Sequence, residues 1–165
     1  NGNTEYEKDI EEFFVQRLII YLNSDYSKNV LEACSGSDNS ALNPCKDLND
    51  YVNRVKVVSG LDDEKLVENA NRVLRILKDA VNIDLKTELF TLQAEKDLFN
   101  AIQSVNFTGD YKNYLDSLVK INPIVTKFFD DVLVMDKDES IKNNRLSLLN
   151  KLKNKYTMLT NFAQL

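Results

Sequence analysis

The basic residues near the end of the chain have the types and spacing that suit binding to a polyanion. From Ser140 to Leu165 the sequence contains no Asp or Glu. The same segment carries five cations, which are Lys142, Arg145, Lys151, Lys153 and Lys155. Cations gathered on one helix can neutralise the phosphates of a nucleic acid without reading its base sequence. The alternative for these residues is an ordinary solvated helix face.

The chain as a whole is acidic, with a formal net charge of −5. This value is unusual for a protein that binds nucleic acid, but net charge says little when charges of one sign are segregated. Residues 5–12 hold five acids and a single Lys, whereas the last segment holds only cations. A basic surface is therefore compatible with the overall charge.

Residues for catalysis, by contrast, are missing. The sequence has no His, the commonest general base and metal ligand, and its four Gly are too widely spaced for a phosphate-binding loop. Cys34 and Cys45 without His cannot form a typical zinc site, and we interpret both as reduced thiols. Adjacent acids such as Asp130-Asp131 point in different directions on a helix. We predict no catalytic residue, metal or cofactor in this chain.

The elements that must position these side chains are predicted to be helices. A chain of 165 residues suits one domain, 1–165, and only 4 Gly and 2 Pro argue against a turn-rich β fold. Apolar residues recur at helical spacing over about 4–23, 26–34, 45–58, 64–81, 92–105, 111–134 and 138–162. Residues 35–44 are predicted to form a loop, residues 85–91 are ambiguous, and the sixth helix must bend or restart near Pro123. The prediction is a single all-α bundle of about six to seven helices.

The segment from Phe107 to Leu149 carries a more specific pattern. It contains Phe107-Thr-Gly109-Asp110-Tyr111, Leu115, Leu118, Pro123-Ile-Val125, Phe128-Phe129-Asp130-Asp131-Val132-Leu-Val134-Met135 and Asn143-Asn144-Arg145-Leu146-Ser-Leu148-Leu149. Earlier stretches that fit are Phe14-Val-Gln-Arg17-Leu18 and Arg72-Val73 with Ile76-Leu77. Together these residues resemble the C-terminal region of the glycyl-tRNA synthetase β subunit, which has a helical, DALR-type anticodon-binding fold.

The resemblance implies a function. The chain would recognise the anticodon end of tRNA-Gly within a cytoplasmic glycine–tRNA ligase and would not be catalytic by itself. The parent enzyme would use ATP and Mg²⁺, and the partners would be tRNA-Gly, the α subunit and the rest of the β subunit. No apolar run is long enough to span a membrane. The alternative is a helical module that docks other synthetase domains or subunits, which predicts an exposed apolar patch.

Helical geometry places two arginines on apolar faces. Arg145 falls in the middle of the face formed by Ile141, Leu148 and Leu152. A guanidinium there needs a carboxylate partner, or it lies at the mouth of a groove and contacts RNA. The candidate partners for a structural ion pair are Asp130, Asp131 and Asp138. Arg17, on the side of Ile10, Phe14 and Tyr21, is predicted to be half-buried and structural.

Other polar residues are predicted to point outward. Arg72, Arg75 and Lys65 share the outer half of the helix over 64–81, where they could contact phosphates or simply be solvated. Asn143 and Asn144 could bind the edges of unstacked bases. The complete set of RNA-binding candidates is Lys65, Arg72, Arg75, Lys142, Asn143, Asn144, Arg145, Lys151 and Lys153.

Overall fold

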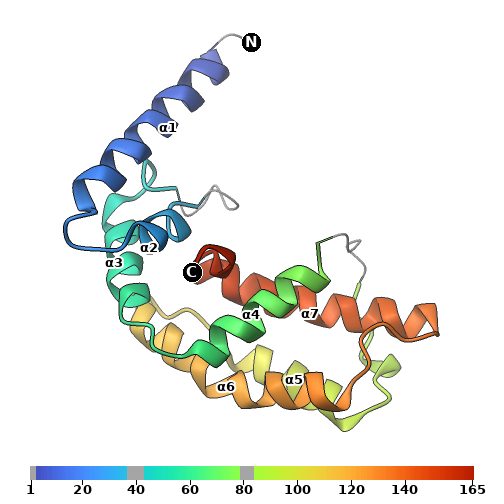
Figure 1. The fold of residues 1–165 in the computed structure, drawn as a ribbon. Coiled ribbons are helices and arrows are strands. Elements are labelled where there is room, and N and C mark those ends of the chain that lie inside the picture. Colours follow the sequence, from blue (N-terminus) through green and yellow to red (C-terminus); the bar gives the residue numbers. More distant parts are fainter. Residues whose placement is uncertain (1–2, 37–42, 79–83) are drawn as a thin grey trace. The chain divides into compact units, whose positions relative to one another are not determined.

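The computed structural model describes residues 3–36, 43–78 and 84–165 (Figure 1). Within these ranges the chain contains α- and 3-10 helices and no strand, which confirms the all-α prediction. The elements are α1 (Asn3–Leu22), α2 (Lys28–Ala33), α3 (Leu48–Ser59), α4 (Glu64–Ile76), η2 (Thr87–Leu89), α5 (Gln93–Ser104), α6 (Tyr111–Asp131), α7 (Glu139–Leu159) and η3 (Phe162–Gln164). None of the described helices is both long and apolar enough to cross a membrane.

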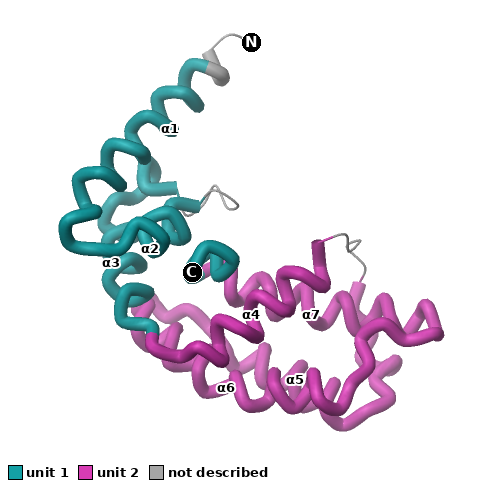
Figure 2. The backbone as a smooth tube through the Cα atoms, in the orientation of Figure 1, with its two compact units in different colours: residues 1–61, 159–165 teal, residues 62–158 magenta. Residues whose placement is uncertain are grey.

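The chain divides into two compact units (Figure 2). Unit 1 comprises Asn1–Leu61 together with Leu159–Leu165, and unit 2 comprises Asp62–Met158. Unit 1 holds α1, α2, α3 and η3, whereas unit 2 holds α4, η2, α5, α6 and nearly all of α7. The assignment of residues 1–165 to one domain stays a prediction.

Unit 1 is built around the short helix α2. The Ser27 side chain caps the start of α2, and α2 contacts α1, α3 and η3. The end of the chain returns to this helix, because the Asn161 amide donates a hydrogen bond of 2.9 Å to the carbonyl of Ala33. In the buried interior, the Tyr51 hydroxyl donates to the carbonyl of Leu31 over 3.0 Å. Burial raises the pKa of Tyr51 well above its usual range.

Unit 2 is organised around α6, which packs against α5 and α4 (Figure 1). The Asp110 carboxylate caps α6 by accepting hydrogen bonds from two backbone amides, and the Asp63 carboxylate caps α4 by accepting one from the Leu66 amide. Pro123 lies inside α6, which continues through it as one helix and does not restart. The Tyr114 hydroxyl donates a 2.8 Å hydrogen bond to the carbonyl of Lys155 on α7. This contact joins α6 to α7.

Several predicted boundaries differ from the structure. The third helix begins at Leu48 and not at residue 45, because the Asp47 side chain accepts a hydrogen bond from the Asp50 amide and so defines the first turn. The fourth helix ends at Ile76, while residues 79–81 of its predicted range lie outside the described residues. The ambiguous segment 85–91 contains only the 3-10 turn η2. Of the predicted loop 35–44, residues 37–42 lie outside the described residues.

Candidate nucleic-acid interface

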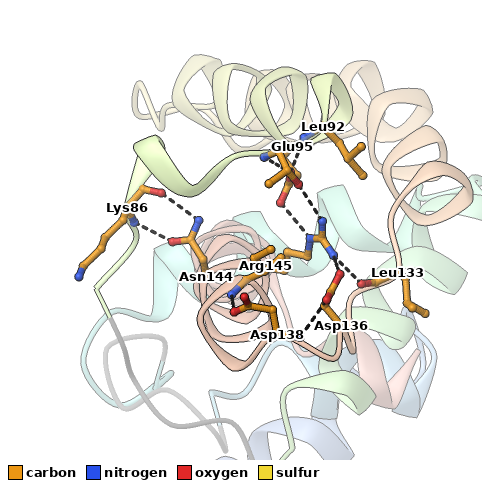
Figure 3. Close-up of polar contacts among 10 residues, drawn as sticks. Lys86, Leu92, Glu95, Leu133, Asp136, Asp138, Asn144 and Arg145 are labelled. Carbon is orange, nitrogen blue, oxygen red and sulfur yellow. Dashed lines mark hydrogen bonds and ion pairs between the residues drawn. The ribbon is translucent and has the colours of Figure 1, made fainter.

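Arg145 is buried in unit 2, where its guanidinium holds three parts of the chain together (Figure 3). It is 4% exposed and donates to the Glu95 carboxylate over 2.9 Å and to the Asp136 carboxylate over 2.7 Å. It also donates to the carbonyl of Leu133 over 2.9 Å and to the Thr91 hydroxyl over 3.1 Å. Arg145 therefore ties α7 to the start of α5 and to the segment between α6 and α7.

Glu95 has a second function at the start of α5. Its other carboxylate oxygen accepts hydrogen bonds from the amides of Thr91, at 2.8 Å, and Leu92, at 2.7 Å (Figure 3). A carboxylate at a helix N-terminus also complements the helix dipole. The same side chain thus caps α5 and neutralises the buried guanidinium of Arg145.

Asp136 supplies the more exposed carboxylate of this network. The backbone amide of Asp138 donates to it over 3.0 Å, and the Arg145 guanidinium donates from the other side. These hydrogen bonds, first from the backbone and then from Arg145, hold the pKa of Asp136 below its ordinary value. The ion pair between Asp136 and Arg145 therefore attaches the segment before α7 to that helix.

The predicted partners of Arg145 were wrong. Asp131 pairs with Lys127 at 2.6 Å, Asp138 accepts from the amides at the start of α7, and Asp130 is exposed. Side chains on a helix lean toward its N-terminus, which brings Arg145 to Asp136 just before α7. Its other partner is fifty positions away in sequence, on α5, a proximity that helical periodicity does not reveal.

Asn144 was predicted to project outward, and the structure places it in the interior. It is 3% exposed, and its side-chain amide donates to the carbonyl of Lys86 over 2.9 Å while accepting from the Lys86 amide over 2.7 Å (Figure 3). Both ends of this amide are occupied by backbone groups. Asn144 and Arg145 are therefore structural residues in this conformation and not surface contacts for RNA. Asn143 is half-buried and lines a cavity of about 190 Å³ with Lys86.

Arg17 was predicted to be half-buried, and it is exposed. Its guanidinium lies 5.2 Å from the centre of the Phe13 ring. The apolar residues assigned to the same face are exposed as well, with Ile10 at 67% and Tyr21 at 79%. Periodicity identifies an apolar helix face, but it does not tell whether another element of the same chain covers that face.

The remaining candidates lie mainly on the surface of unit 2. Arg72, Arg75 and Lys151 are exposed, and Lys153 is half-buried. Lys65 pairs with Glu68 at 2.8 Å, and Lys142 pairs with Glu139 at 2.6 Å. Exposed pairs of this kind are worth only about 0–1 kcal/mol, so they can open to contact a phosphate.

Arg72 lies beside a cavity of about 500 Å³. The centre of its guanidinium is 4.1 Å from the centre of the Phe129 ring, a cation–π contact between α4 and α6. The cavity is lined by Arg72, Ile76, Phe129, Asp130, Asp131, Val132, Leu133, Val134 and Met135. This site combines an exposed cation with apolar walls and two carboxylates.

Sequence reasoning missed a second buried arginine, Arg54 on α3, which has no exposed surface. It donates to the Asp50 carboxylate over 2.8 Å and to the carbonyl of Cys34 over 2.7 Å. Two signals were present in the sequence. Arg54 lies at helical spacing among the buried residues Tyr51 and Val58, and Asp50 precedes it by four positions.

These features define an all-α protein whose polar residues either hold the helices together or lie on the surface. In the described part of the chain, no group of three or more His, Cys, Asp or Glu side chains could hold a metal ion. No family model matches the sequence.

The chain is similar to a segment of glycine–tRNA ligase β subunits. It is 35% identical to the β subunit of Thermodesulfovibrio yellowstonii over 157 residues, which cover 88% of this chain and 22% of that protein. It is 32% identical to the β subunit of Aquifex aeolicus over 162 residues, or 98% of this chain and 24% of that protein. The β subunit of Streptococcus mutans is 34% identical over 100 residues. The chain therefore spans less than a quarter of the length of these relatives.

Proposed function

We propose that this chain binds tRNA-Gly at its anticodon end, as one part of a glycine–tRNA ligase β subunit. The observation that carries the proposal is the similarity to β subunits, which extends over 98% of this chain in one relative. The all-α fold agrees with the helical, DALR-type anticodon-binding class that the sequence resembles. In this proposal the chain contributes to glycyl-tRNA synthesis by binding, while ATP, Mg²⁺ and the α subunit act elsewhere in the assembly.

The surface of unit 2 offers groups that suit tRNA. Arg72 and Arg75 on α4 and Lys151 on α7 are exposed cations, and Lys142 and Lys65 can join them by leaving their weak surface pairs. Such side chains contact phosphates and make binding fall as salt rises. Base recognition requires a further site, because phosphate contacts carry no sequence information.

The test is the affinity of this chain for a tRNA-Gly transcript and for the same transcript with a substituted anticodon, across a salt series. We expect tighter binding to the native anticodon, with both affinities decreasing as salt rises. Equal affinity for the two transcripts would contradict anticodon recognition. Absence of binding at low salt would contradict tRNA binding by this chain altogether.

A second candidate function is docking to another part of the synthetase, which the exposed face of α1 favours. Tyr6, Ile10, Phe13 and Ile20 follow one another at helical spacing and are 61–72% exposed, and Arg17 lies between them. Half-buried residues lie on another side of α1, among them Val15, Leu18 and Leu22. A row of large exposed apolar side chains is typical of an interaction surface.

This second candidate predicts that the double variant Ile10→Ser/Phe13→Ser weakens association with the remainder of the β subunit and leaves the helical circular dichroism unchanged. Glu12→Ser, an exposed position on the same helix, is the matched control. If both variants associate as the unmodified chain does, α1 is not the docking surface.

A further inference from the structure

The cavity beside Arg72 has the composition of a site for a planar, hydrogen-bonding ligand. Its volume of about 500 Å³ falls in the range of pockets that hold small ligands, about 300–1,000 Å³. Leu133 and Met135, in the segment after α6, are exposed at 68% and 59% and supply apolar edges. Asp130 and Asp131 supply acceptors, since an ionised carboxylate accepts hydrogen bonds and does not donate them.

Arg72 offers a flat surface at this cavity. Phe129 is 7% exposed and its ring lies against the guanidinium centre, 4.1 Å from it, whereas Arg72 itself is exposed. Among the described residues the structure shows no ion pair for Arg72, unlike Lys65 and Lys127 nearby on α4 and α6. A guanidinium whose one face rests on a ring presents its other face and its in-plane N–H groups to a ligand. Bases of single-stranded RNA stack on such planes.

One part of the cavity lining, the segment of residues 133–135, is attached to the buried network of Arg145. That guanidinium binds the carbonyl of Leu133 and the carboxylate of Asp136, one on each side of Val134-Met135 (Figure 3). The cavity is therefore lined by residues of α4 and α6 and by an anchored segment that follows α6. A site with fixed walls loses less conformational freedom when it binds a ligand.

We infer that this cavity takes one unstacked base of an RNA loop, stacked on the Arg72 guanidinium, with Asp130 accepting a hydrogen bond from an amino group on the base edge. The inference rests on the proposed function and specifies the chemistry of one subsite. Among the pyrimidines it selects cytosine, whose N4 amino group donates, over uracil, which has a carbonyl oxygen at that position. Asp130 is chosen because Asp131 is already paired with Lys127.

The test measures, by fluorescence anisotropy, binding of the complete chain to short oligocytidine and oligouridine RNAs and to the tRNA-Gly transcript. The unmodified chain should prefer oligocytidine. Arg72→Ala should lower that affinity about tenfold, since stacking of one base contributes on that order. Arg72→Lys should fail to restore it, because an ammonium keeps the charge and loses the plane. Asp130→Asn should abolish the preference for cytosine over uracil, a loss of about tenfold in discrimination.

Arg75→Ala is the matched control, because Arg75 is an exposed arginine on the same helix and does not line the cavity. It should reduce binding to both oligonucleotides equally and only slightly. If the chain binds tRNA but Arg72→Ala behaves like Arg75→Ala, or oligocytidine and oligouridine bind equally, the base site is overturned and the proposed function stands. If the unmodified chain binds neither tRNA nor oligonucleotide, the proposed function fails and the base site with it.

Discussion

Within the described residues each unit buries an arginine side chain, and the two are neutralised in different ways. In unit 1, Arg54 meets Asp50 one helical turn earlier on α3, and that carboxylate keeps 28% of its surface exposed. In unit 2, Arg145 meets Glu95, which lies on another helix and is only 1% exposed. The first pair is local and borders on water, whereas the second joins distant segments in the interior.

This difference determines what each pair does for the fold. A pair four residues apart on one helix forms whenever the helix forms, so it adds little information about tertiary structure. A buried pair between segments fifty residues apart exists only when α5 and α7 are correctly packed. Removing one member then leaves an uncompensated charge in the interior. The two arginines should therefore respond differently to the same substitution.

The largest expected effect follows from Arg145→Met, which keeps the length of the side chain and removes its charge. Because Glu95 would remain buried without a counter-ion, we expect the free energy of unfolding to fall by about 3–5 kcal/mol. Urea denaturation measures this change. Lys142→Met, on the same helix but in an exposed pair with Glu139, is the control and should change stability by less than about 1 kcal/mol. Equal effects of the two variants would contradict the claim that the buried ion pairs of Arg145 stabilise unit 2.

Arg54→Met should have a smaller effect, about 1.5–3 kcal/mol, because Asp50 can be rehydrated when its partner is lost. The Cys34 thiol reports on this region, because the backbone carbonyl of Cys34 accepts a hydrogen bond from Arg54. The thiol is buried, and burial raises its pKa. Labelling of Cys34 by a thiol reagent should accelerate in Arg54→Met, while the exposed Cys45 is labelled quickly in both proteins. If Arg54→Met lowered the free energy of unfolding by more than Arg145→Met does, the local pair in unit 1 would be the more stabilising one, which contradicts the comparison.

The Asp136 carboxylate should make part of the stability of unit 2 depend on pH. Its pKa is lowered in the folded state, so the ionised form favours folding at pH values above its unfolded pKa. That contribution is lost as pH falls below about 4 and through the folded pKa. Thermal unfolding should show Asp136→Asn to be less stable than the unmodified chain at pH 7, with the gap closing as pH is lowered. A gap that stays constant down to pH 3 would contradict this role.

The smallest expected effect on stability is that of Arg72→Ala. Its contact with the Phe129 ring is an exposed cation–π interaction, worth about 0.5–1 kcal/mol. Thermal unfolding should therefore change little, which separates this surface arginine from the two buried ones. A destabilisation as large as that of Arg54→Met would mean that Arg72 is structural. Any loss of RNA binding in Arg72→Ala would then follow from disturbed folding and not from a lost contact with RNA.

Much of the secondary structure was predictable because it depends on neighbours in sequence. Apolar residues such as Leu66, Val73 and Leu77 recur at helical spacing, and capping residues such as Asp63 and Asp110 mark where helices begin. The predicted start of α3 was wrong because the cap formed by Asp47 was overlooked. Of the two outcomes predicted at Pro123, a bend or a restart, the structure excludes the restart.

The sequence by itself determined that the chain is helical, that its last segment is basic, and that Arg145 lies on an apolar helix face. These properties follow from residue types and from spacing along one helix, which no distant residue alters. Only the tertiary structure decided that Glu95 and Asp136 neutralise Arg145, that Asn144 binds the backbone at Lys86, and that the apolar face with Ile10 stays exposed. Each of these depends on which elements pack together, and packing brings into contact residues whose separation along the chain carries no information about their distance in space.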